Sequence, residues 1–211
     1  MARERTVPDR IETAADVEAG RQYLLRLEPR FAAIPGPLPL RRRADGFSAL
    51  LHAIVGQQVS TASAAAIWGR LQAEGFDREE AVCRGSDEDL KRCGLSGPKV
   101  RYARALVDAR LDYAGLRHAP AEEVLQTLIA VPGIGRWTAE IYAKFALGHA
   151  DVFAAGDLAL QEGAKLLFDL PARPAEREMR VMAEDWSPVR AIAARALWAY
   201  YRARTKREGA L

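Results

Sequence analysis

The chain has 211 residues, of which 49% are hydrophobic and 28% are charged, a composition that excludes an intrinsically disordered protein and permits one or two compact domains. Lysine and arginine number 31 against 28 aspartates and glutamates, so the net charge of +3 indicates only a weak preference for polyanionic partners. The apolar stretches are too short to span a bilayer, and two cysteines, Cys83 and Cys93, are too few for a disulfide framework or a four-cysteine metal site.

Apolar residues recur at helical spacing along most of the chain, and strand-like alternation is almost absent. The clearest apolar faces comprise Phe47, Leu50, Leu51, Ile54 and Val55; Val124, Leu125, Leu128 and Ile129; and Val189, Ile192, Ala193, Ala196 and Tyr200. Turn-forming residues at 34–39, 94–98 and 132–135 separate helical segments. Asp157 and Ser187 are expected N-caps, the latter with Pro188 at the first helical position. We predict an all-α fold of about ten helices.

Residues 124–147 form an apolar helix, a tight Pro-Gly-Ile-Gly turn and a second helix that starts near Arg136. Gly133 and Gly135 lack a Cβ, so they are free to adopt positive φ and to let another backbone approach closely. The second helix then presents free N–H groups and its positive dipole end, which suits a phosphate diester. Position 138 is Thr and the preceding segment is helical, so a dinucleotide-binding fold is excluded.

The sequence VPGIGRWTA (131–139) resembles the helix–hairpin–helix of the DNA glycosylase superfamily, in which an acidic residue follows some twenty positions later. Asp157 lies 22 residues beyond Gly135. The resemblance extends in matching order over residues 45–201. It includes LLHAIVGQQVSTASAAAIWGRL (50–71), CGLSGPKVRYARAL (93–106) and WSPVRAIAARALWAYY (186–201).

The branch of the superfamily follows from two absences. Bifunctional lyases carry a Schiff-base lysine where this chain has Trp137, and the iron–sulfur branch needs four cysteines beyond the catalytic Asp. The chain therefore looks like 3-methyladenine DNA glycosylase II in a short form without that family's N-terminal β domain. The resemblance implies a two-lobed fold with the active-site cleft between the lobes. We expect an N-terminal helical segment (1–46) that packs with the C-terminal lobe (151–211), and a central domain (47–150) that contains the hairpin.

The implied activity is hydrolysis of the N-glycosidic bond of alkylated purines, of the 3-methyladenine and 7-methylguanine type. The base is flipped out of duplex DNA and an abasic site remains. A carboxylate at Asp157 would stabilise the cationic sugar of the transition state and orient water. On local sequence alone, N-capping is the better explanation of Asp157, and the hairpin at the matching distance reverses that preference; the two roles are compatible.

Aromatic residues are candidates for the pocket that holds the flipped cationic base, since a Trp face attracts a cation. The resemblance places Trp137 and Trp198 there. Tyr142 and Phe47 are further candidates from local spacing. For all four, packing in the core is the alternative.

The resemblance assigns DNA binding to the hairpin residues Gly133, Gly135, Arg136 and Thr138, and to Gln57 and Gln58 of the segment that probes the duplex; Lys99 in the other glycine-rich loop is a further candidate. The best-known relatives place an apolar wedge where this chain has Gln58. A second departure is Ala154-Ala155-Gly156, where a Pro is usual before the Asp, so a looser turn is expected there.

No cofactor is expected to be required, although the resemblance implies a Na⁺ or K⁺ ion on the backbone carbonyls of Ile129, Val131 and Gly133. The three histidines share no ligand spacing, so no transition metal is indicated. The expected partner is double-stranded DNA with alkylated bases, bound by a monomer. With a charged N-terminus and few cysteines, we expect a cytoplasmic protein with no membrane partner, associated with the nucleoid in a prokaryote.

Two other interpretations remain open at this point. The chain could be a non-catalytic helix–hairpin–helix DNA-binding protein, or a glycosylase for another damaged base. Asp157 discriminates against the first, because a pure binder has no use for a carboxylate that faces the anionic DNA backbone.

Overall fold

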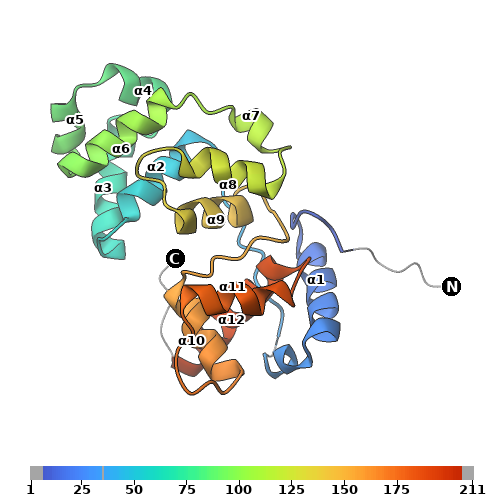
Figure 1. Ribbon diagram of the computed structural model, residues 1–211. Helices are drawn as coiled ribbons and strands as arrows, with labels where there is room; N and C mark the ends of the chain where they lie inside the picture. The colour runs from blue at the N-terminus through green and yellow to red at the C-terminus, as the bar shows by residue number, and fades with distance from the viewer. Residues whose placement is uncertain (1–6, 35, 206–211) are drawn as a thin grey trace. The chain divides into compact units, whose positions relative to one another are not determined.

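A computed structural model describes residues 7–34 and 36–205 (Figure 1). Every regular element in these ranges is a helix, apart from one isolated bridge between Arg10 and His149, so the all-α prediction is confirmed. In chain order they are α1 (Ala14–Leu27), the 3-10 helix η1 (Pro29–Ala33), α2 (Phe47–Gly56), α3 (Thr61–Ala73), α4 (Glu79–Arg84), α5 (Asp87–Arg92), α6 (Gly97–Asp108), α7 (Tyr113–Leu116), α8 (Ala121–Ile129), α9 (Arg136–Phe145), α10 (Leu158–Leu167), α11 (Glu176–Glu184) and α12 (Arg190–Thr205). Within the described ranges, no helix is both long and apolar enough to cross a membrane.

The chain folds into two compact units. The first contains the described residues up to Arg42 together with those from Ala143 onward, and the second is Arg43–Tyr142. The divisions therefore fall after residues 42 and 142, whereas the sequence led us to place them after residues 46 and 150. Helix α9 belongs to both units, since the second division lies within it.

The second unit is built around α2 and α6. Helix α2 packs on α3 and α6, and the short helices α4 and α5 pack on α6 (Figure 1). All five residues of the predicted α2 face are buried, as expected. On α8 the prediction is wrong at its last position, because Ile129 is 39% exposed while the three preceding apolar residues are buried.

The first unit is centred on α12, which packs on α10 and α1. The predicted α12 face is buried throughout. The helix begins at Arg190, so the prediction that Ser187 is its N-cap and Pro188 its first residue is wrong. Ser187 instead donates a hydrogen bond to the carboxylate of Asp151. Edge-to-face and stacked contacts of Trp186 with Phe31, Phe153 and Phe168 complete this core.

The crossing of α10 and α12 depends on Gly163. A Cβ at this position would lie 2.7 Å from the backbone carbonyl oxygen of Leu197, so the helices would have to separate. Gly69 of α3 is the opposite case, because a Cβ there would meet nothing within 4 Å.

We therefore expect Gly163→Ala to lower the free energy of unfolding by about 1–3 kcal/mol through overpacking. Gly69→Ala, the matched control, should raise it by up to about 1 kcal/mol through helix propensity. Urea denaturation measures both values. Equal effects of the two substitutions would show that α10 and α12 are not in close contact.

Candidate active site

The hairpin between α8 and α9 is a tight turn closed by a hydrogen bond from the Ile134 N–H to the Val131 carbonyl, 3.0 Å long. Gly133 has φ +92°, and a Cβ there would lie 2.3 Å from Cγ of Tyr102 on α6. The Gly133 carbonyl also accepts a hydrogen bond from Nε2 of Gln57 at 2.9 Å. Gly133 is therefore the position at which the hairpin is attached to the rest of the second unit.

Gly135 differs from Gly133 in its φ and in the space around its Cα atom. Its φ lies outside the left-handed region, so Gly135 does not use the freedom to adopt a positive φ that its lack of a Cβ allows. A Cβ at Gly135 would meet nothing within 4 Å, and its carbonyl accepts the first helical hydrogen bond, from Ala139. The first N–H groups of α9 lack intrahelical acceptors, so this open end of the helix suits an anion.

Gln57 and Gln58 end α2 with different backbone conformations. Gln57 is extended and directs its amide to the hairpin, which gives it a positioning role that sequence spacing did not reveal. Gln58 is exposed and has φ +56°, which is rare for a residue with a side chain. The next residue, Val59, is 39% exposed and supplies an apolar side chain beside the predicted wedge. Insertion of Gln58 into DNA stays a prediction.

Lys99 and Arg136, the two basic residues predicted to contact DNA, both interact with other groups of the protein. Lys99 is only 9% exposed, and its ammonium group donates a 2.6 Å hydrogen bond to the Val55 carbonyl near the end of α2. Burial also lowers the pKa of Lys99. The structure thus gives Lys99 a structural contact and lends no support to a DNA contact. Arg136 is half exposed and forms an ion pair with the buried Glu140, one turn further along α9.

Two of the predicted pocket aromatics lie on α9. Trp137 is 36% exposed, whereas Tyr142 is 5% exposed. The five-residue separation places them about 140° apart around the helix, so they face different surroundings. Tyr142 accepts a 2.8 Å hydrogen bond from the Gly46 N–H at the start of α2, and burial raises its pKa. Phe47, which follows Gly46 and is another of the predicted pocket aromatics, is 7% exposed. Thr138 is also buried.

In the first unit, Asp157 is the N-cap of α10, as predicted. Its Oδ1 atom accepts hydrogen bonds from the backbone N–H groups of Ala159 (2.9 Å) and Leu160 (3.2 Å). A third hydrogen bond to the same atom comes from Nε1 of Trp198, at 3.1 Å. Three donors on one oxygen fix the plane of the carboxylate.

The loop before Asp157, which lacks the usual proline, is held by two hydrogen bonds. The Asp157 N–H donates to the Ala154 carbonyl at 3.0 Å, which closes a turn. Gln161, one turn into α10 and 6% exposed, donates from Nε2 to the Ala155 carbonyl at 2.9 Å. A turn looser than one with a proline stays a prediction, and Gln161 is a positioning residue that the sequence analysis did not identify. Its spacing of four residues from Asp157 was the available signal.

Trp198 is 5% exposed and stacks on Phe145 with ring centroids 5.4 Å apart. Its indole nitrogen is engaged by Asp157. Its role as a platform for the flipped base stays a prediction. The contact that the structure does give it is to the carboxylate.

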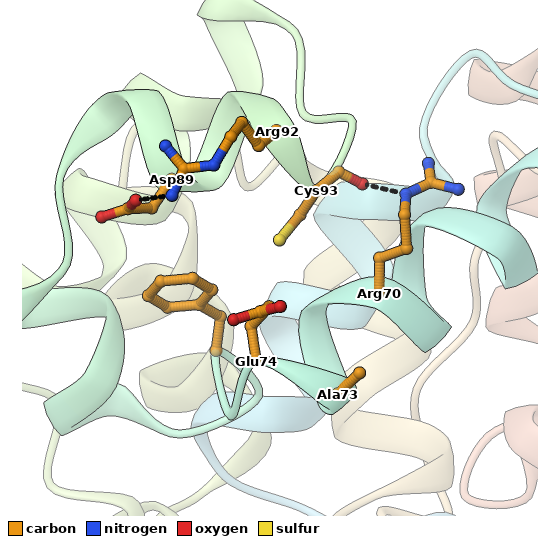
Figure 2. A pocket seen from close by; sticks show the side chains of 7 residues that line it. Arg70, Ala73, Glu74, Asp89, Arg92 and Cys93 are labelled. Atoms are coloured by element: carbon orange, nitrogen blue, oxygen red, sulfur yellow. Dashed lines mark hydrogen bonds and ion pairs between the residues drawn. The ribbon is translucent and has the colours of Figure 1, made fainter.

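A cavity of about 400 Å³ lies elsewhere in the second unit, between the end of α3 and α5 (Figure 2). Its lining contains none of the predicted site residues. Arg92 pairs with Asp89, and Arg70 donates to the Cys93 carbonyl, so these charged side chains satisfy one another and the backbone. Burial raises the pKa of the Cys93 thiol, which disfavours a reactive thiolate.

A family model for HhH-GPD superfamily base excision DNA repair proteins matches residues 51–188, a range that contains the hairpin and Asp157. The chain belongs to this superfamily. The sequence of this chain is 31% identical to that of a DNA-3-methyladenine glycosidase from Bacillus halodurans. The two structures superpose with a TM-score of 0.81 over 89% of this chain and 91% of that one.

Two further similar proteins come from Schizosaccharomyces pombe. The 3-methyladenine DNA glycosylase Mag1, solved in complex with abasic DNA, is 26% identical with a TM-score of 0.66 over 85% of this chain and 89% of that one. The alkylbase DNA glycosidase-like protein mag2 is 25% identical over 199 residues, 87% of this chain and 93% of that protein. A DNA-3-methyladenine glycosylase 2 of Escherichia coli is 30% identical over 79% of this chain and 61% of its own length.

The contrast between the two hairpin glycines yields a prediction for DNA binding. Gly135→Val should remain folded with only a small drop in the midpoint of thermal unfolding, because its side chain enters open space although Val is a poorer N-cap residue than Gly. It should weaken binding to duplex DNA at least about tenfold, because the side chain occupies the space that a phosphate needs to reach the α9 N–H groups. Fluorescence anisotropy on two unrelated sequences measures the affinity, with Gly69→Val as the control. A folded Gly135→Val protein with wild-type affinity would place the DNA elsewhere.

Proposed function

We propose that this protein is a monofunctional glycosylase that removes alkylated purines from duplex DNA and leaves an abasic site. The observation that carries the proposal is the carboxylate of Asp157, oriented by three donors at the start of α10 in a chain whose hairpin belongs to a base excision repair superfamily. The printed names of the relatives, 3-methyladenine and alkylbase glycosylases, support the substrate class.

The reaction separates a base that is already cationic from its sugar. Alkylation at adenine N3 or guanine N7 weakens the glycosidic bond, so the base leaves as a neutral molecule while positive charge develops on the sugar. Asp157 stabilises that charge electrostatically and orients the water that attacks C1′. Because its orientation is already set by the protein, little reorganisation is required at the moment of reaction.

Hydrolysis without a lyase step agrees with the two residues that bear on it. Trp137 occupies the position of the lyase lysine. Lys144, the one lysine of the 124–147 segment, is fully buried. The exposed ring of Trp137 provides a surface for a cationic base, where a cation–π contact contributes about 2 kcal/mol when water is excluded.

A purely DNA-binding role explains the hairpin but not Asp157. N-capping alone would be served by Ser, Thr or Asn. A carboxylate repels phosphate and weakens DNA binding, so a protein that only binds DNA gains nothing from it. The additional donor from Trp198 serves the carboxylate and no helix end.

We therefore expect Asp157→Asn to lower the rate of base release from methylated DNA at least about a hundredfold, because the preorganised charge is lost. The free energy of unfolding should change by less than about 0.5 kcal/mol, since Asn is an equally good N-cap. DNA affinity should be unchanged or higher. Chromatography of released bases under single-turnover conditions measures the rate, with the exposed Asp185→Asn as the control. Full activity in Asp157→Asn would refute the catalytic assignment.

The hairpin carbonyls of Ile129, Val131 and Gly133 would hold a monovalent cation. Those of Val131 and Gly133 each already accept one protein hydrogen bond, and each carbonyl has a second lone pair. Such an ion would add positive charge beside the phosphate site. DNA affinity should then be higher in K⁺ or Na⁺ than in tetramethylammonium at equal ionic strength, and equal affinities would argue against an ion here.

A further inference from the structure

A buried lysine lies next to the tryptophan that holds Asp157. Lys144, near the end of α9, has no solvent-accessible surface. Its Nζ atom lies 3.9 Å from the centroid of the Trp198 ring and 4.9 Å from that of Phe145. All these residues belong to the first unit, so the cation, the indole and the carboxylate form one continuous cluster.

The burial of an ammonium group requires a physical reason. Removal of this group from water is costly unless polar or π groups replace its hydration. The faces of Trp198 and Phe145 provide part of that replacement. A methionine of similar length would fill the same space but would place no positive charge on the face of the Trp198 ring.

A second buried cation in this cluster, Arg195, has a different role from Lys144. Arg195, one turn before Trp198 on α12, is 1% exposed and lies 5.0 Å from the centroid of Phe145. Its guanidinium donates to the carbonyls of Leu40 and Ala191, so it connects backbone segments. Burial, with Arg41 and Arg42 nearby, lowers its pKa to about 10. Lys144, by contrast, faces the ring whose N–H reaches Asp157.

We propose that Lys144 is a positioning residue that acts through Trp198 on the carboxylate of Asp157, a role that rests on the proposed function of that carboxylate. A cation on the face of an indole draws electron density from the ring, so the Nε1–H becomes a stronger donor. The same contact fixes the plane of the ring and aims the Nε1–H at Oδ1. Lys144 thus strengthens the side-chain hydrogen bond to Asp157 while the two backbone donors remain unchanged.

The experiment combines enzyme kinetics with a spectroscopic signature. Lys144→Met should lower kcat for base release about fivefold while KM stays within about twofold, because a partial loss of one hydrogen bond affects orientation and not DNA binding. Lys144→Arg should restore most of the rate. Lys165→Met, which removes one positive charge from α10, is the control and should match wild type.

The indole N–H proton of Trp198, assigned by its loss in Trp198→Phe, reports on the hydrogen bond directly. In ¹H–¹⁵N spectra it should move upfield in Lys144→Met and not in Lys165→Met. A double-mutant cycle completes the test: if Lys144 acts through the indole, Trp198→Phe with Lys144→Met should have the kcat of Trp198→Phe alone. If Lys144→Met fails to fold, Lys144→Gln takes its place in the same cycle.

The outcomes separate the two proposals. An unchanged indole resonance in folded Lys144→Met, or additive losses in the cycle, would overturn the role of Lys144 and leave the glycosylase proposal intact. Wild-type protein that releases no base would overturn the glycosylase proposal, and the indole resonance would still decide whether Lys144 orients Trp198.

Discussion

The hydrogen bonds that converge on Oδ1 of Asp157 are the interaction on which the proposed chemistry depends. Two come from the first turn of α10 and exist because every helix leaves N–H groups without acceptors at its start. The third, from Trp198, crosses from α12. A capping carboxylate is ordinary, but one held by a side chain from a second helix has a defined plane. That plane decides which direction the negative charge faces.

Supporting contacts surround this carboxylate on several sides. Gln161 holds the turn before it, and the close α10–α12 crossing at Gly163 brings Trp198 within reach. Lys144 lies over the face of the Trp198 ring. Each contact is local and modest in energy, yet together they leave the carboxylate few alternative orientations. Electrostatic catalysis benefits from such rigidity, because a charge that is already oriented does not have to be reoriented during the reaction.

Periodicity was sufficient to predict the helices, because the apolar faces of α2 and α12 are regular and fully buried. The hairpin and Asp157 were recognisable from motif spacing. Contacts that join distant segments were not: neither the hydrogen bond from Gln57 to Gly133 nor the burial of Lys99 leaves a local pattern. The start of α12 was misplaced because a Ser-Pro pair is equally compatible with a turn, where Ser187 reaches Asp151 instead of a helix end.

The two glycines of the hairpin are constrained from opposite sides. Gly133 is required by the protein itself, since Tyr102 and a positive φ leave no room for a side chain. Gly135 adjoins open space, so no neighbouring atom of the described protein excludes a side chain there. If a related protein no longer bound an anion at this hairpin, substitutions at position 135 would be tolerated, whereas substitutions at position 133 would still disturb the fold. The residue at position 135 therefore indicates whether a hairpin of this kind binds an anion, and the residue at position 133 indicates only whether the hairpin is folded.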